Sequence, residues 1–127
     1  MARDGDFLVV SEKAICTALG RLVDEAHVRP GSLARALAWW VRWAWGYLLG
    51  PLCHLRPETL AKLRAYPLAE GAAHKQVALR HAGFLAALMW GSEGGIDASN
   101  LPYSYVALPL RPQEAVELAE QLAERVR

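Results

Sequence analysis

One segment constrains this chain more than any other: residues 33–53 combine four tryptophans and Tyr47 with leucine, alanine and valine. A stretch of this length approaches a bilayer span. Arg42 lies near its centre, and a charge at that depth argues against a membrane-crossing helix. Gly46, Gly50 and Pro51 are expected to break the segment before it reaches full length. The segment therefore predicts a very apolar helix that needs another surface to pack against, with Pro30-Gly31-Ser32 as its preceding turn and N-cap.

The four tryptophans of this helix cannot all face one small core, because successive residues turn by about 100° around the axis. Trp39 and Trp43 share a face, while Trp40 and Trp45 point elsewhere. Packing in the core or against a second copy is the preferred interpretation, and it predicts a homodimer. The alternative is contact with a membrane surface, since Trp and Arg suit a headgroup boundary.

The composition indicates a single globular domain spanning residues 1–127, because 54% of the residues are apolar and 21% are charged. A net charge of +1 provides no broad basic field, so no nucleic-acid partner is expected. The first residues do not resemble a signal peptide, which predicts a cytoplasmic protein. Cys16 and Cys53 lack the CxxC spacing and are interpreted as reduced thiols, with a single disulfide as the open alternative.

The remaining segments predict an α+β fold, in which a mixed sheet of short strands has flanking helices. Strands are expected at residues 7–10, 21–24 and 103–108. One helix should start at Pro57-Glu58 and stop before Tyr66-Pro67.

The clearest helix should begin at Arg111-Pro112 and carry an apolar stripe at helical spacing. The stripe consists of Ala115, Leu118, Ala119, Leu122 and Val126. Residues 76–90 are ambiguous, because alanine and leucine favour a helix that Gly83 would interrupt.

A rigid polar loop is predicted at residues 94–102, which begin with two glycines and end with a proline. Asp97 can offer oxygen ligands to a divalent cation. Ser99 and Asn100 can donate hydrogen bonds to a phosphate or to the Asp97 carboxylate. The alternative is structural: Asp and Ser commonly cap turns. Glu93 adjoins the loop and could add an oxygen ligand. Neither the histidine pairs nor Cys53-His54 has the spacing of a zinc site.

Two motifs together resemble the coenzyme F420-0:gamma-glutamyl ligase family. The first is Gly5-Asp6-Phe7-Leu8-Val9-Val10-Ser11-Glu12-Lys13, followed by Ala18-Leu19-Gly20-Arg21-Leu22-Val23, and the second is the Gly-Ile-Asp-Ala-Ser-Asn loop. The family opens with Gly-Asp, an apolar strand, a Lys and then Glu-Gly-Arg, and later has Gly-Ile-Asp-x-Ser-Asn. The resemblance covers about residues 5–24 and 75–127, and it implies strands in residues 76–90 that lead into the Asp97 loop.

The resemblance implies a GTP-dependent ligase that adds L-glutamate to coenzyme F420-0. GTP would be the co-substrate, with a divalent metal (Mg or Mn) and, as an option, a monovalent cation. Asp97 would be a metal ligand. The residues implied in nucleotide or substrate binding are Ser11, Lys13, Arg21, Ser99 and Asn100, and no catalytic residue is implied. The structural alternatives are a surface role for Lys13 and a pairing of Arg21 with Asp24 or Glu25.

The chain departs from the family pattern at Leu19, which replaces the Glu of Glu-Gly-Arg, and at Glu93, which replaces an Asn. The family's chains are about twice as long and carry a second acidic metal motif. This chain is therefore expected to be one half of a larger ligase-like protein. The alternative function is a non-catalytic dimerisation or assembly module, which could contact a membrane surface through the Trp-rich helix.

Overall fold

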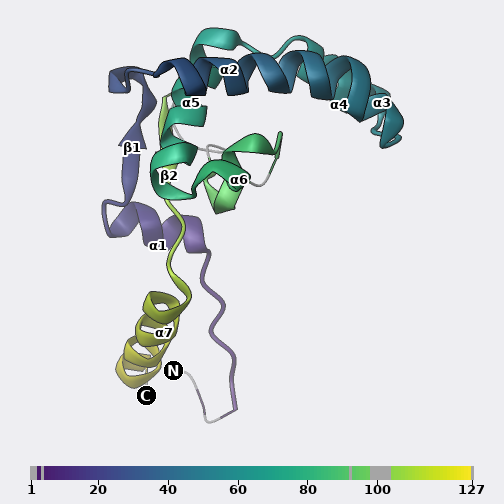
Figure 1. Ribbon diagram of the computed structural model, residues 1–127. Coiled ribbons are helices and arrows are strands. Elements are labelled where there is room, and N and C mark those ends of the chain that lie inside the picture. Colours follow the sequence, from purple (N-terminus) through teal and green to yellow (C-terminus); the bar gives the residue numbers. More distant parts are fainter. Residues whose placement is uncertain (1–2, 4, 92, 98–103, 127) are drawn as a thin grey trace.

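The computed structural model describes residues 3, 5–91, 93–97 and 104–126 (Figure 1). Within them, helices surround one two-stranded antiparallel sheet, which confirms the α+β class. The N-terminal half contains α1 (Glu12–Ala18), β1 (Leu22–Asp24), the 3-10 helix η1 (Glu25–His27), α2 (Ser32–Trp40), the π-helix η2 (Val41–Leu49) and α3 (Gly50–Leu52). The C-terminal half contains α4 (Pro57–Arg64), α5 (Leu68–His81), α6 (Phe84–Leu88), the 3-10 helix η3 (Glu93–Gly95), β2 (Tyr105–Ala107) and α7 (Pro112–Val126).

The sheet joins the two predicted strands on either side of the central helices. Leu22 pairs with Ala107, and Asp24 pairs with Tyr105. One more residue extends this ladder, because Asp97 forms an isolated antiparallel bridge to Ala107. The strand predictions for residues 21–24 and 103–108 are therefore confirmed over their described parts.

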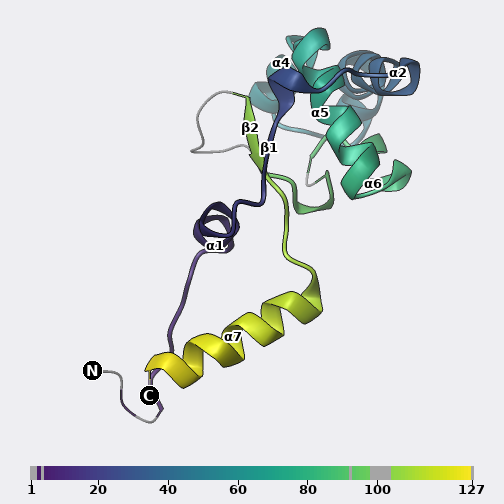
Figure 2. The same ribbon diagram turned by 90° about the vertical axis from the view of Figure 1, so that its left-hand side faces the viewer.

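The strand predicted at residues 7–10 is wrong. This segment has no strand partner among the described residues, and Phe7 and Val9 are 95% and 91% exposed. β-prone side chains form a strand only where a neighbouring strand and a packing surface exist. Phe7, Leu8 and Val10 instead line an open groove of about 1000 Å³ together with the apolar stripe of α7. Figure 2 shows α7 beside the N-terminal segment.

The strands implied for residues 76–90 are also wrong, because this part of the chain is helical. α5 continues to His81, and α6 follows from Phe84. The two helices are separated at Gly83, whose φ of 88° is left-handed and suits glycine. The helices predicted to begin at Pro57 and after Arg111 are both confirmed.

The Trp-rich segment forms one continuous helical stretch over residues 32–52, made of α2, η2 and α3 and called the Trp-rich helix below. The break expected at Gly46, Gly50 and Pro51 is wrong. A side chain at Gly50 would collide with the carbonyl of Trp45 and with Leu60, so this glycine allows close packing instead of ending the helix.

A side chain from α4 compensates for the proline in this helix. A π-helix pairs the carbonyl of one residue with the N–H five positions later, and Gly50 N–H donates to the Trp45 carbonyl in this way. The matching donor for the Gly46 carbonyl would come from position 51, where proline has no N–H. Arg64 Nε donates to that carbonyl at 2.9 Å instead.

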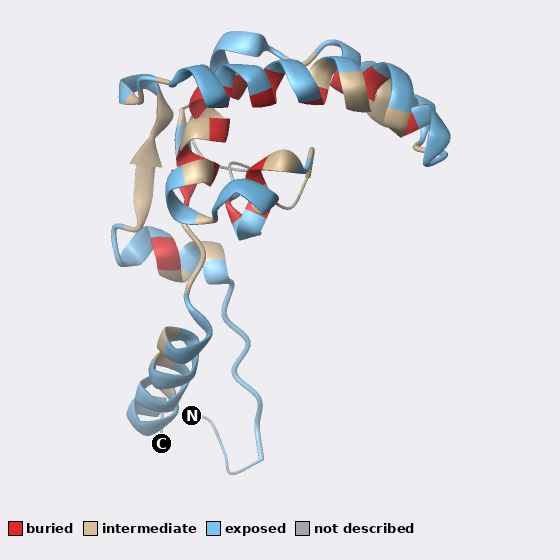
Figure 3. Ribbon diagram, viewed as in Figure 1, coloured by how far each residue is buried: buried red, intermediate tan, exposed pale blue. Residues whose placement is uncertain are grey.

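The main core lies where the Trp-rich helix, α5, α6 and β2 meet (Figure 3). Its buried members are Leu37, Val77, Ala78, Ala87, Ile96 and Val106. Ile96 belongs to the predicted polar loop, so one apolar side chain anchors that loop in the core. By contrast, α7 has no buried residue among those described, and Figure 3 shows it as mostly exposed, with a few intermediate positions.

Three rings form a row along the outer side of the Trp-rich helix. The ring centres of Trp39 and Trp43 are 5.9 Å apart, and those of Trp43 and Tyr47 are 5.1 Å apart in a stacked arrangement. We call Trp39, Trp43 and Tyr47 the aromatic row. Trp45 instead packs beside Trp90, with ring centres 6.3 Å apart. The predicted division of the tryptophans between faces is thus confirmed for Trp39, Trp43 and Trp45. No helix among the described residues is long and apolar enough to cross a membrane.

Candidate functional site

The backbone at Asp97 is held in place by the residues that precede it and by hydrogen bonds to β2. Gly94 and Gly95 have φ angles of 70° and 84°, which non-glycine residues rarely adopt, and a side chain at Gly94 would collide with Ala82. Ile96 then enters the core with 8% exposure. Asp97 N–H donates to the Ala107 carbonyl at 3.2 Å and Asp97 accepts from Ala107 N–H at 2.8 Å. The loop therefore holds the Asp97 main chain against β2.

The carboxylate of Asp97 meets Lys13 of α1. Lys13 Nζ lies 2.8 Å from Asp97 Oδ2, and the two side chains are 20% and 49% exposed. The pair brings together the two sequence motifs, which are far apart along the chain. Because the pair is reached by solvent, its contribution to stability is about 0–1 kcal/mol, and it can open at little cost. We call the Lys13–Asp97 pair and its surroundings the candidate site.

The other predicted site residues have different placements. Ser11 is the N-cap of α1, where its carbonyl accepts a hydrogen bond from Ile15 N–H and its side chain makes no capping bond. Ser99 and Asn100 lie outside the described residues, so their predicted roles stay predictions.

Arg21 contacts α7 and the segment that precedes it. Its Nη1 donates to Glu114 Oε2 at 2.7 Å, and its Nη2 donates to the Pro109 carbonyl at 3.2 Å. The pairing of Arg21 with Asp24 or Glu25, considered from the sequence, is wrong, because its carboxylate partner comes from α7. The pKa of the Glu114 carboxyl is lowered, mainly by the hydrogen bond from Arg111 N–H and further by the hydrogen bond and charge of Arg21. Together these effects outweigh burial, which acts to raise this pKa.

A charged cluster lies behind the loop, and it contains Glu25, His74, Lys75 and Glu93. His74 Nδ1 lies 2.6 Å from Glu25 Oε1, while His74 Nε2 and Lys75 Nζ both contact the Glu93 carboxylate. Lys75 is fully buried and also donates to the Met89 carbonyl at 2.5 Å. Two cations and two carboxylates thus neutralise one another inside the protein, as buried charges require.

The cluster changes the ionisation of its members. Burial acts to lower the pKa of His74, but hydrogen bonds to Glu25 and Glu93 outweigh it and raise the pKa to about 9. Burial lowers the pKa of Lys75 against the opposing effect of Glu93. Burial acts to raise the pKa of Glu93, but hydrogen bonds and charge from His74 and Lys75 lower it overall. The cluster therefore carries a charged imidazolium at neutral pH.

The same cluster corrects one ligand suggested from the sequence. Glu93, a candidate oxygen ligand, points into the protein and is 5% exposed, while Asp97 lies at the surface. Sequence spacing could not reveal this, because His74 and Lys75 lie on α5 and meet Glu93 only through the fold. One signal was present: Lys75 stands among apolar residues of a helix that buries Ala72, Ala73, Val77 and Ala78.

The described residues do not by themselves form a metal centre. No group of three or more His, Cys, Asp and Glu side chains in the described part of the chain is arranged to hold a metal ion. Asp97 supplies one carboxylate, and Lys13 already contacts one of its oxygens. A magnesium site usually combines one or two carboxylates with substrate phosphates and water. Cys16 and Cys53 are both free thiols, as the sequence analysis predicted.

Comparison with known proteins gives a consistent result. The family model described as F420-0:Gamma-glutamyl ligase matches residues 1–127, including the Trp-rich helix. The chain is also similar to the uncharacterized protein MJ1361 of Methanocaldococcus jannaschii, with 39% identity over 124 residues. This match covers 98% of the chain and 42% of the relative, so the chain spans about two fifths of the length of the curated relative. No solved structure matches the chain.

Proposed function

Because the chain belongs to the F420-0:gamma-glutamyl ligase family, we propose that it contributes part of the active site of a GTP-dependent ligase that adds L-glutamate to coenzyme F420-0. The contact between Lys13 and Asp97 carries this proposal, since it unites the two family motifs at one solvent-reached point. The charged cluster and the Ala107 bridge give that point a fixed support.

The proposed chemistry is formation of an amide bond. A carboxylate must first become an acyl phosphate, because a free carboxylate does not react with an amine. Lys13 then has a direct use: its ammonium group can leave Asp97 and neutralise charge on a phosphate or on the substrate carboxylate. Arg21 and Ser11 are proposed to bind nucleotide or substrate nearby, and Ser99 and Asn100 complete the predicted set.

GTP, a divalent metal (Mg or Mn) and an optional monovalent cation belong to the proposal. Asp97 is the proposed metal ligand of this chain. Since the described residues contain no group of three or more His, Cys, Asp and Glu side chains that could hold a metal ion, we propose that further ligands come from outside them. The homodimer expected from the sequence stays a prediction, which light scattering of the purified chain tests through the molar mass.

We further propose that residues beyond the matched region of the family contribute to the active site. The chain matches 42% of its relative, and no group of three or more His, Cys, Asp and Glu side chains among the described residues is arranged to hold a metal ion. We therefore propose that the remaining part of such a protein, joined or separate, completes the active site.

The test combines the chain with a polypeptide that covers the unmatched part of MJ1361. Coenzyme F420-0, L-glutamate, GTP and manganese are added, and mass spectrometry detects the product with one added glutamate. Product that requires both polypeptides and GTP supports the proposal. If the two polypeptides form a stable complex that makes no glutamylated product, the proposed activity is wrong.

A further inference from the structure

We propose that the Trp-rich helix binds the surface of a membrane that contains anionic lipids, and that it lies flat with the aromatic row in the headgroup region. This proposal does not depend on the ligase activity.

The first observation is that the helix has two unlike sides. One side packs against α5 and α4 and buries Ala34, Leu37, Ala38, Val41, Gly46 and Gly50. The other side exposes the aromatic row, whose residues are 58%, 42% and 51% exposed, and also Leu48 and Leu52 at 67% and 71%. A helix that is apolar on a free side and fixed to a protein on the other suits a position in the membrane interface.

The second observation is the charge of this part of the chain. No acidic residue occurs between Glu25 and Glu58, and residues 29–64 contain six Arg and Lys side chains against the single acid Glu58. The rest of the chain is net acidic, because the whole has a net charge of +1. The positive charge is thus concentrated in the Trp-rich helix and its flanking segments, where it complements anionic headgroups.

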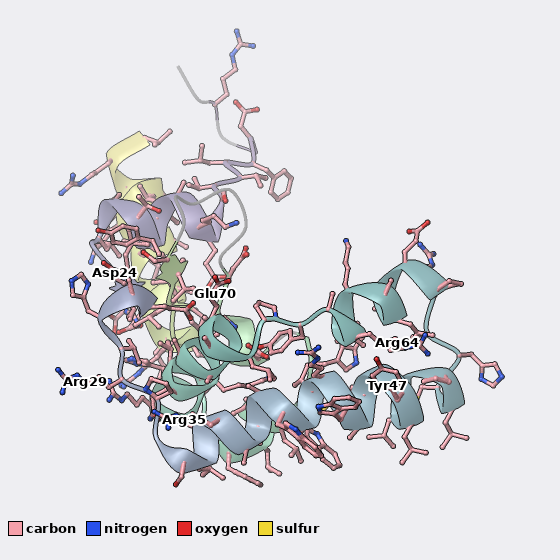
Figure 4. The ribbon with its side chains drawn as sticks, turned by 90° about the horizontal axis from the view of Figure 1, so that it is seen from above. Asp24, Arg29, Arg35, Tyr47, Arg64 and Glu70 are labelled. Atoms are coloured by element: carbon pink, nitrogen blue, oxygen red, sulfur yellow. The ribbon has the colours of Figure 1, made fainter. Side chains whose placement is uncertain are left out.

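Arginines lie directly beside the aromatic row. The Arg42 guanidinium is 5.8 Å from the centre of the Trp43 ring, and that of Arg64 is 4.9 Å from the centre of the Tyr47 ring. Figure 4 shows Arg64 reaching from α4 toward Tyr47, with Arg35 farther along the long helix. Amphipathic rings next to cations are typical of the boundary between headgroups and acyl chains.

Two other occupants fit this surface less well. A single-stranded nucleic acid needs open ring faces for its bases, but Tyr47 stacks on Trp43, and contact with bases would not bury the exposed Leu48 and Leu52 as acyl chains do. A second copy in a two-fold interface would place the same positive segment opposite itself. Acyl chains accept both the rings and the leucines, and anionic headgroups accept the arginines.

Vesicle flotation with the 127-residue chain tests the proposal. The chain should float with vesicles of equal parts phosphatidylcholine and phosphatidylglycerol, and it should float much less with pure phosphatidylcholine. The tryptophan emission should shift to shorter wavelength in the same samples. High salt should weaken binding, because screening shortens the reach of the arginines.

Matched variants locate the binding surface. Leu52→Gln should lower the partition coefficient roughly tenfold, because it removes an inserted apolar side chain. Leu85→Gln on α6, where the leucine is 79% exposed, makes the same chemical change elsewhere and should have no effect. Arg35→Gln should lower the partition coefficient about fivefold, whereas Arg80→Gln on α5 should not.

Three results would overturn the proposal. One is a folded chain that stays with the unbound protein in the presence of anionic vesicles. Another is a dimer that dissociates in Leu52→Gln while the chain ignores vesicles, since a second copy would then occupy the surface. The last is binding of a single-stranded oligonucleotide that is lost in Trp43→Ser, without vesicle binding.

Discussion

At the scale of single residues, Lys13 and Asp97 illustrate how a pair can be weak for stability and still suited to function. The two side chains lie 2.8 Å apart at a solvent-reached position, so either can exchange its partner for a ligand. The main chain of Asp97 cannot move as easily, because the Ala107 bridge and the buried Ile96 hold it. A movable side chain on a fixed backbone is what a binding group requires.

The first prediction concerns this pair in the completed ligase. Asp97→Asn should abolish metal-dependent GTP turnover, because the amide keeps the shape but loses the charge needed opposite a cation. Lys13→Ala should reduce turnover less completely. Neither change should shift Tm by more than a few degrees, since the pair contributes about 0–1 kcal/mol to stability. Turnover and thermal unfolding are measured side by side, with the exposed Glu117→Gln of α7 as control. Equal turnover in Asp97→Asn and the parent would show that the loop is only structural.

The second prediction concerns His74 and pH. Its folded-state pKa is about 9, above the value of about 6.5 expected in the unfolded chain. The resulting stabilisation is therefore fully present below about pH 6.5 and is lost as the pH rises through 9. Its size is on the order of 3 kcal/mol. Urea unfolding at a series of pH values measures this loss.

A variant assigns the effect to the cluster. His74→Gln should be less stable near pH 6.5 and should lose less stability than the parent as the pH rises to 9. His81→Gln, in which an exposed histidine is replaced, should follow the parent curve. If His74→Gln and the parent lose stability in parallel, the imidazolium does not hold the cluster together.

At the scale of elements, the Trp-rich helix depends on two glycines for its close packing. Gly46 lies against Arg64, and Gly50 lies against Trp45 and Leu60. Glycines often end a helix, but here both glycines are points at which the Trp-rich helix contacts α4. The result is a long helix that α4 and α5 support along one side.

The third prediction tests this packing. Gly50→Ala should destabilise the chain by roughly 1–3 kcal/mol, because the added methyl group meets the Trp45 carbonyl as well as Leu60. Gly91→Ala is the matched control, since a methyl group there would meet no atom within 4 Å. Urea unfolding gives both values. Equal stability of the two variants would mean that the helix shifts freely and that Gly50 is not a packing point.

The elements also show what the sequence could and could not reveal. Local sequence signals are enough to predict the helix starts at Pro57 and after Arg111, and also the strands β1 and β2. The tertiary structure does not override these signals. The strand predictions for residues 7–10 and 76–90 are wrong because a strand needs a neighbouring strand. Neither the local sequence pattern nor the family resemblance shows whether such a neighbour exists. The family resemblance places Lys13 and Asp97 in one site, but it does not predict that the two side chains touch. The cluster around Glu93 depends on tertiary contacts that cannot be read from the spacing of residues in the sequence.

At the scale of the whole molecule, the candidate site lies at one end of the sheet, and the Trp-rich helix extends away from it (Figure 1). α7 and residues 7–10 leave a long apolar groove open between them. The molecule therefore separates its proposed chemical part from its proposed membrane-binding part.

The fourth prediction concerns the 127-residue chain by itself. It should show no GTP-dependent glutamate ligation above a sample without enzyme, because no group of three or more His, Cys, Asp and Glu side chains in the described part of the chain is arranged to hold a metal ion. Each loss of roughly 1.4 kcal/mol in transition-state stabilisation lowers the rate tenfold, so a few missing contacts suffice. Mass spectrometry of the product provides the measurement, with the two-polypeptide mixture as the positive control. Clear turnover by the chain alone would show that its own residues complete the site.

The proline in the Trp-rich helix has an evolutionary consequence. Pro51 removes a main-chain donor, and Arg64 on another helix supplies the donor that the Gly46 carbonyl needs. The two positions are therefore coupled through this hydrogen bond. A replacement of Pro51 restores the N–H and removes this one constraint on Arg64, whereas loss of Arg64 while Pro51 remains takes away the donor of the Gly46 carbonyl. The order in which such substitutions accumulate is thus constrained by a single hydrogen bond.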